Sequence, residues 1–205
     1  LSVAERQGRD GATFLKAVTA GYDLGVRVNL ARGPMVLNDE GHSGHSSGSL
    51  FGATAAVGTL MKFKPGQVRH LFSYAVQQAS GIPCWTRDPE HIEKAFDFSS
   101  MGARNGVAAA TMIQSGFTGI LDALEGERNV LDALSTDAAP EEIVADLGSR
   151  FYVEETAIKT FPVGYPMQSP LAAFFTLREE YGLTVDNVEH ILLRLPEDGA
   201  RIVDS

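Results

Sequence analysis

Apolar residues recur at α-helical spacing through most of the first 150 residues. Those of residues 10–28 fall on one face, and Asp10 suits a helix N-cap. The same pattern, with Pro and Gly as boundaries, predicts further helices at residues 49–63, 66–79, 88–96, 101–115, 119–125, 128–134 and 140–147. Two of them, 49–63 and 101–115, are rich in Gly and Ala, whose small side chains let helices approach closely. We therefore predict an all-helical body that also forms a homodimer.

The pattern changes near residue 150. Residues 151–153 are strand-like, residues 169–181 return to helical spacing, and residues 188–195 alternate enough for a strand. These features predict a mainly α protein, with an all-helical domain in residues 1–150 and the start of a mixed α/β domain in residues 151–205.

The composition of the chain argues against two classes of protein, those that bind nucleic acid and those that span a membrane. The chain has 205 residues, 44% of them hydrophobic, and a net charge of −9, which makes nucleic acid an improbable partner. No segment approaches the roughly 20 apolar residues of a membrane span. Cys84 is the single cysteine, so no intrachain disulfide forms, which fits a reducing, cytoplasmic location. The chain starts at Leu1 without Met and ends just after a strand-like segment, so we expect a piece of a longer protein.

The first candidate site is the segment from Gly41 to Ser49, predicted as a loop that runs into a helix N-terminus. It holds His42 and His45 among glycines and hydroxyls. Histidine suits proton transfer near neutral pH, and a helix N-terminus offers free N–H groups to a carboxylate. A flexible, solvated loop is an equal alternative. A zinc site is less favoured, because no cysteine or clear third ligand accompanies the two histidines.

Two lysines lie in further candidate segments. Lys94 is in residues 93–98, where a helix end with a surface ion pair is the simpler interpretation. Lys159 is in residues 158–170, where prolines restrict the backbone. A lysine held in such a loop suits carboxylate binding, and a rigid interdomain linker is the alternative.

Short stretches along nearly the whole chain resemble, in the right order, motifs of the MmgE/PrpD family. They are AGYDLG at 20–25, HSSGSLFGATAAVG at 45–58, QQASG at 77–81, KAFDFSSMGARNGVAAA at 94–110, GFTG at 116–119, LEG at 124–126 and IKTFP at 158–162. The resemblance implies a helical domain with a smaller α/β lid, an active site between them, and a dimer. Members of the family dehydrate 2-methylcitrate, decarboxylate cis-aconitate or epimerise iminodisuccinate, and they need neither a metal nor an organic cofactor.

The resemblance also implies site residues. The family's loop histidine falls on His42 or His45, and its two lysines fall on Lys94 and Lys159. The spacing to the following glycines requires a one-residue gap, so both histidines stay candidates. We expect the lysines to bind carboxylates and one histidine to move the proton.

The chain departs from the family pattern at two places. Asp97 stands where the family often has a histidine, and Gln168 is the nearest polar residue where some members carry another. Both are candidate substrate-binding residues. The leading hypothesis is a cofactor-free lyase or isomerase of small di- or tricarboxylates, with dehydration, decarboxylation and epimerisation left open. The alternative is a non-catalytic ligand-binding module or scaffold, which the two missing histidines support.

Overall fold

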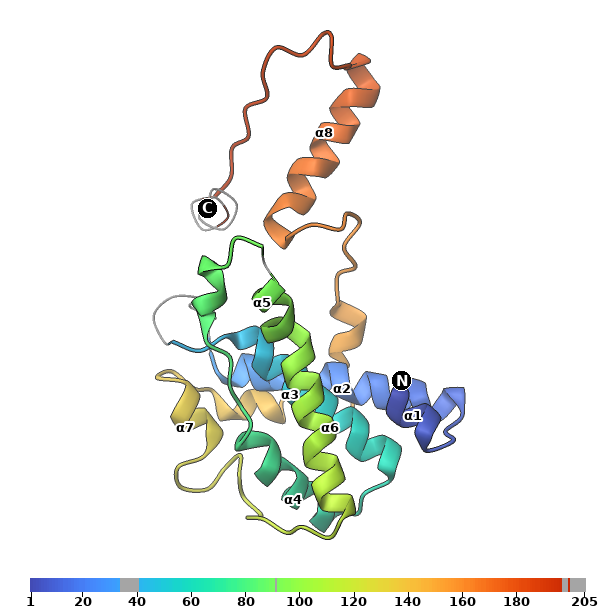
Figure 1. Cartoon of the computed structure of the whole chain (residues 1–205), viewed down its shortest axis with the longest axis vertical. Helices are drawn as coiled ribbons and strands as arrows, with labels where there is room; N and C mark the ends of the chain where they lie inside the picture. Colours follow the sequence, from blue (N-terminus) through green and yellow to red (C-terminus); the bar gives the residue numbers. More distant parts are fainter. Residues whose placement is uncertain (34–40, 91, 197–198, 200–205) are drawn as a thin grey trace. The chain divides into compact units, whose positions relative to one another are not determined.

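The chain divides into two compact units, Leu1–Glu155 and Thr156–Ser205. The computed structural model describes residues 1–33, 41–90, 92–196 and 199 (Figure 1).

The first unit is built from helices. They are α1 (Ser2–Arg6), α2 (Gly11–Ala31), α3 (Gly44–Met61), α4 (Pro65–Val76), α5 (Ile92–Ala95), α6 (Met101–Gln114) and α7 (Val130–Leu134). Short 3-10 helices occupy Pro83–Arg87, Pro140–Ile143 and Tyr152–Glu155, and a π-helical turn, Phe96–Ser100, leads into α6. The predicted mainly helical class is confirmed.

Local chemistry sets several helix starts. The Asp10 carboxylate accepts a hydrogen bond from the backbone N–H of Thr13, which confirms the predicted N-cap and lowers the pKa of Asp10 below its usual 3.8. Pro65 opens α4, where its missing N–H costs nothing. Asn129 caps α7 in the same way as Asp10 caps α2.

Two of the predicted short helices are not α-helices. Residues 119–125 form turns, because the N–H groups of Gly119 and Ile120 bond to the side chains of His70 and Ser73 on α4. The second, predicted over residues 140–147, is only the 3-10 helix Pro140–Ile143 followed by turns.

Helix α3 lies at the centre of the first unit and packs against α2 and α6. A Cβ on Gly25 of α2 would stand 2.6 Å from the Gly48 carbonyl oxygen of α3, and one on Gly106 of α6 would stand 2.9 Å from the Thr54 nitrogen. The small residues therefore serve contacts inside the chain. They give no separate support for the predicted homodimer, which stays a prediction.

Two apolar clusters flank α3. One joins α2, α3, α4 and α7 through Val28, Leu50, Phe51, Ala75 and Leu131, among others. The other joins α3, α4 and α6 through Val57, Leu71, Ala109, Ala110 and Ile113. Burial on both sides fixes the direction in which the N-terminus of α3 points.

A buried arginine holds the end of the first unit. Arg27 of α2 is 1% exposed and forms an ion pair with Asp23, 2.9 Å between Nε and Oδ2. Its guanidinium also donates to the carbonyls of Ala145 and Arg150 and lies 5.2 Å from the ring centroid of Tyr152. Residues up to Glu155 therefore belong to the helical body.

The second unit contains the 3-10 helix Tyr165–Met167 and helix α8 (Gln168–Tyr181), which ends at Gly182 with φ of 59°. The helix expected at 169–181 is present. The strands expected at 151–153 and 188–195 are wrong, because the first segment meets a 3-10 helix and the second has no regular structure. A strand needs a partner to satisfy its backbone, and no strand occurs in the described ranges.

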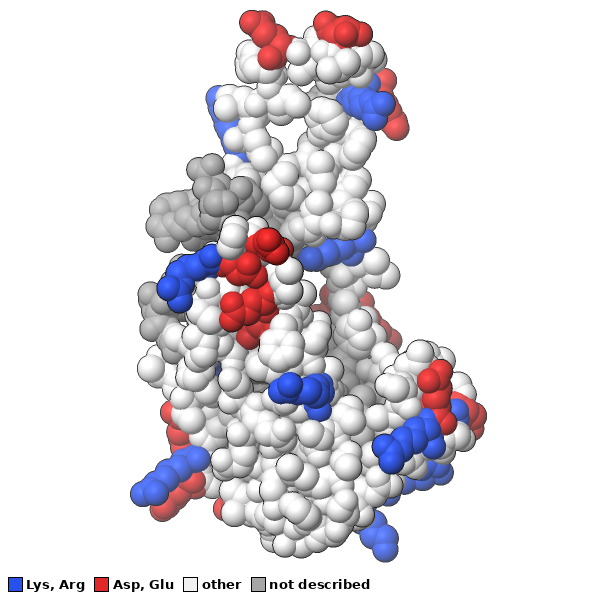
Figure 2. Space-filling model, in the orientation of Figure 1, with Lys and Arg blue, Asp and Glu red and all other residues white. Residues whose placement is uncertain are grey.

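Charges of both signs are interspersed on the face of the molecule drawn in Figure 2, between wide uncharged areas. No extended basic surface is seen among the described residues on that face.

Candidate functional site

The two loop histidines lie at the start of α3. The helix begins at Gly44, so His45 belongs to its first turn, while His42 and Ser43 precede it. The prediction of a loop as far as Ser49 is therefore wrong for its second half. The small residues there allow α3 to pack closely on its neighbours, and that packing supports an earlier helix start. Residues 34–40, which precede this segment, lie outside the described residues.

The segment after α4 crosses this helix start. The backbone N–H of Ser43 donates to the Gly81 carbonyl, at 2.8 Å, and the Ser46 hydroxyl donates to the Ser80 carbonyl. Gly81 has φ of 124°. A Cβ on Gly81 would overlap the Ser46 hydroxyl and stand 2.8 Å from Oδ1 of Asp97. Glycine at this position thus lets three segments meet.

An aromatic cluster connects His45 to Lys94. The His45 ring stacks on Phe98, with centroids 3.8 Å apart and planes 7° from parallel. Trp85 meets Phe98 edge to face at 5.0 Å. Lys94 Nζ lies 5.3 Å from the centroid of Phe98 and 5.4 Å from that of Trp85. Its ammonium group is held by aromatic faces, and it forms no ion pair with any described residue.

Asp97 is 5% exposed, although Phe96 before it is exposed and Phe98 after it is only partly buried. The π-helical turn Phe96–Ser100 turns its side chain toward Gly81, and such turns often occur at functional sites. Within the described part of the chain, Oδ2 of Asp97 has no hydrogen-bond partner, and neither do the buried Ser43 Oγ and Trp85 Nε1. The site therefore holds one acceptor on Asp97, one N–H donor on Trp85 and one hydroxyl on Ser43 that make no hydrogen bond to the described residues.

The comparison with known families adds one finding. The MmgE/PrpD N-terminal domain matches residues 1–143. The chain belongs to the MmgE/PrpD family. The match includes His42, His45, Lys94 and Asp97, and it ends before Lys159. No curated protein matches the chain.

The remaining two predicted site residues of this MmgE/PrpD chain lie in the second unit. Lys159 is exposed. Gln168 opens α8, and its amide accepts from the Phe161 N–H at 3.1 Å and donates to the carbonyls of Phe161 and Val163. The amide thus braces the loop that carries Lys159. Substrate binding by either residue stays a prediction.

Sequence reasoning did not identify Ser43, Gly81, Trp85 or Phe98 as site residues. The available signals were the QQASG motif, which contains Gly81, and the single tryptophan, two residues after Pro83. Neither signal indicates which residues lie next to it in the fold. Cys84 is partly exposed, and its thiol donates to the Glu93 carboxylate, which raises the pKa of Cys84. It is correspondingly a poor nucleophile.

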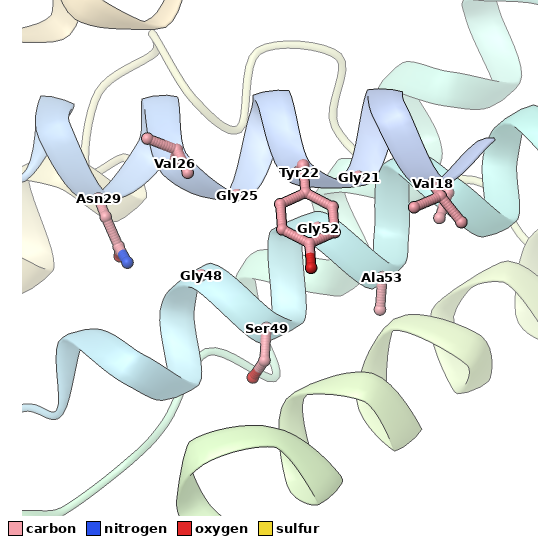
Figure 3. Close-up of a pocket in the computed structure, with 11 residues that line it drawn as sticks. Val18, Gly21, Tyr22, Gly25, Val26, Asn29, Gly48, Ser49, Gly52 and Ala53 are labelled. Atoms are coloured by element: carbon pink, nitrogen blue, oxygen red, sulfur yellow. The ribbon is translucent and has the colours of Figure 1, made fainter. Parts of the chain in front are cut away.

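A groove elsewhere on the MmgE/PrpD body has a different chemical character. A groove of about 400 Å³ runs along α2 and α3 and is lined mainly by Gly, Val and Ala. Figure 3 shows Tyr22, Asn29 and Ser49 as its polar side chains. No cation or imidazole is among its lining residues, so the groove offers no charged partner to a carboxylate.

Two other kinds of feature are absent among the described residues. No three His, Cys, Asp or Glu side chains are grouped so that they could hold a metal ion. None of the helices there has both the length and the apolar character to cross a membrane.

Proposed function

We propose that this MmgE/PrpD protein is a cofactor-free lyase or isomerase that moves a proton next to a carboxylate of a small di- or tricarboxylate. The observation that carries the proposal is the gathering of His45, Lys94 and Asp97 at the N-terminus of α3, an 18-residue helix. These three residues come from two segments almost 50 positions apart in the sequence.

His45 is the proposed acid–base group. An imidazole exchanges protons near neutral pH, and general acid–base assistance typically contributes about 10²–10⁴-fold in rate. Its stacking on Phe98 fixes the ring plane, so the proton is delivered in one direction. His42 precedes the helix, and we assign it a supporting role.

Lys94 and the helix start stabilise the charge that builds up in the reaction. Removing a proton from the carbon beside a carboxylate moves negative charge onto the carboxylate oxygens. The Lys94 ammonium, which no described acid neutralises, and the positive end of the α3 helix dipole both favour that charge. The proposal adds Lys159 as a second carboxylate ligand, by resemblance to the family, with Gln168 bracing its loop.

The test is a panel of 2-methylcitrate, cis-aconitate and iminodisuccinate with the intact protein. We expect turnover of at least one, and Lys94→Met should raise its KM, because the carboxylate loses its cation. Lys16→Met is the matched control, since Lys16 is an exposed lysine of α2, and it should leave the kinetics unchanged. Binding without turnover would favour the non-catalytic alternative, and the absence of both would refute the proposal.

A further inference from the structure

Two residues with buried polar side chains contact the same glycine beside the start of α3. Ser43 donates its backbone N–H to the Gly81 carbonyl, and Oδ1 of Asp97 lies 2.8 Å from the position that a Cβ on Gly81 would take. Ser43 is 3% exposed and Asp97 is 5% exposed. Among the described residues, Ser43 Oγ and Asp97 Oδ2 have no hydrogen-bond partner, so they do not bond to each other.

The chemistry of the two groups defines what would satisfy them. An ionised carboxylate only accepts hydrogen bonds, whereas a serine hydroxyl both donates and accepts. Buried polar groups in proteins are almost always bonded, because an unmade bond is costly. A ligand group that bonds to both must therefore donate to Asp97 and donate to or accept from Ser43. A hydroxyl does this.

Charge excludes the other small groups. A substrate carboxylate facing Oδ2 of Asp97 would be repelled. An ammonium group would satisfy Asp97, but the Lys94 ammonium and the positive N-terminal end of α3 oppose a second cation nearby. A neutral donor is the group that fits this environment.

We propose that Asp97 is a specificity-determining residue that accepts a hydrogen bond from a hydroxyl of the substrate, with Ser43 as the second partner of that hydroxyl. The site then selects hydroxylated polycarboxylates over the same carbon skeletons without the hydroxyl. This inference rests on the proposed function, because it assumes that the carboxylates bind at Lys94 and the start of α3. It favours a reaction in which a hydroxyl is lost or gained over decarboxylation or epimerisation.

The test measures binding of two matched pairs to the intact protein by calorimetry, citrate against tricarballylate and malate against succinate. The hydroxylated member should bind about 10–100-fold more tightly, the range expected for a hydrogen bond to a buried charged group. In Asp97→Ala the ratio should fall to within about twofold. In Asp97→Asn, tricarballylate should bind more tightly than to the wild type, because the repulsion is gone. A purely structural Asp97 would weaken both members of a pair alike.

The matched control is Asp23→Asn, which alters another buried aspartate of the same unit, one that pairs with Arg27 of α2. It should keep the wild-type ratio even where it lowers the melting temperature. Equal binding of the two members by the wild type, or a ratio that survives in Asp97→Ala, would overturn the role of Asp97 and leave the proposed function standing. If none of the four carboxylates binds, the proposed function itself fails. Should Asp97→Ala not fold, the near-isosteric Asp97→Asn decides through tricarballylate: tighter binding than to the wild type supports the role of Asp97, and unchanged or weaker binding overturns it.

Discussion

Replacing Gly81 by alanine tests the packing on which the candidate site depends. Gly81 has φ of 124°, a conformation that costs a residue with a side chain about 1–3 kcal/mol. The new methyl group would also overlap the Ser46 hydroxyl, and displacing it leaves the Ser80 carbonyl without that donor, at about 1–3 kcal/mol more. Gly81→Ala should therefore destabilise the first unit by roughly 2–6 kcal/mol, a large part of the ~5–15 kcal/mol typical of a domain.

Urea denaturation followed by the fluorescence of Trp85 measures this cost at the site, because Trp85 is the single tryptophan and packs against Phe98. Gly66→Ala is the matched control. Gly66 is an exposed residue of α4 with no atom near its missing Cβ, so alanine there should be neutral or stabilise by up to about 1 kcal/mol. In a Ser46→Ala background Gly81→Ala should cost less. A cost for Gly81→Ala below about 1 kcal/mol, or one unchanged by Ser46→Ala, would refute the reasoning.

Four further changes probe other parts of the chain. Arg27→Met should cost about 3–5 kcal/mol in the same urea experiment, since it leaves a buried carboxylate unpaired; a loss under 1 kcal/mol would contradict this. His45→Gln should lower kcat by about 10²–10⁴-fold while His42→Gln acts mildly, and equal effects would reverse the assignment. Lys159→Ala should raise KM, with Lys159→Arg a partial rescue, and unchanged kinetics would make its loop purely structural. Asp10→Ala should lower the melting temperature above pH 3.8, and the difference from the wild type should vanish as pH falls through the lower folded pKa of Asp10. A constant difference down to the most acidic pH would argue against a charged N-cap.

The long helices were predictable from the sequence because their apolar faces are repeated over several turns. The expected ranges 10–28 and 101–115 agree closely with α2 and α6. The beginning of α3 was not predictable, since glycines and serines there have weak helix propensity and are typical of a loop. Packing against the glycines of α2 and α6 overrides that local preference. Tertiary contacts, rather than propensity, decide where this helix starts.

The site was predictable as separate residues but not as a group. The resemblance to the family indicated His45 in one motif and Lys94 and Asp97 in another. Their proximity depends on Phe98 and Gly81, which carry no chemical signal in the sequence. The strand predicted at 188–195 failed for a related reason: alternation of residue types indicates a strand only where a partner strand exists, and Leu192 is 71% exposed.

Two buried polar groups of the core, on Arg27 and Thr54, have hydrogen-bond partners, whereas two at the start of α3 have none within the described residues. In the core, Arg27 is bonded to a carboxylate and to backbone carbonyls, and the Thr54 hydroxyl donates to the Leu50 carbonyl. At the start of α3, within the described residues, Ser43 Oγ and Asp97 Oδ2 have no protein partner, at a typical cost of about 1–3 kcal/mol for each unmade bond. The guanidinium of Arg27 shows that this chain can supply hydrogen-bond partners to a buried charged group. Leaving Ser43 Oγ and Asp97 Oδ2 without partners therefore contributes nothing to stability. Their concentration around one glycine is the pattern expected where polar capacity is reserved for a bound molecule.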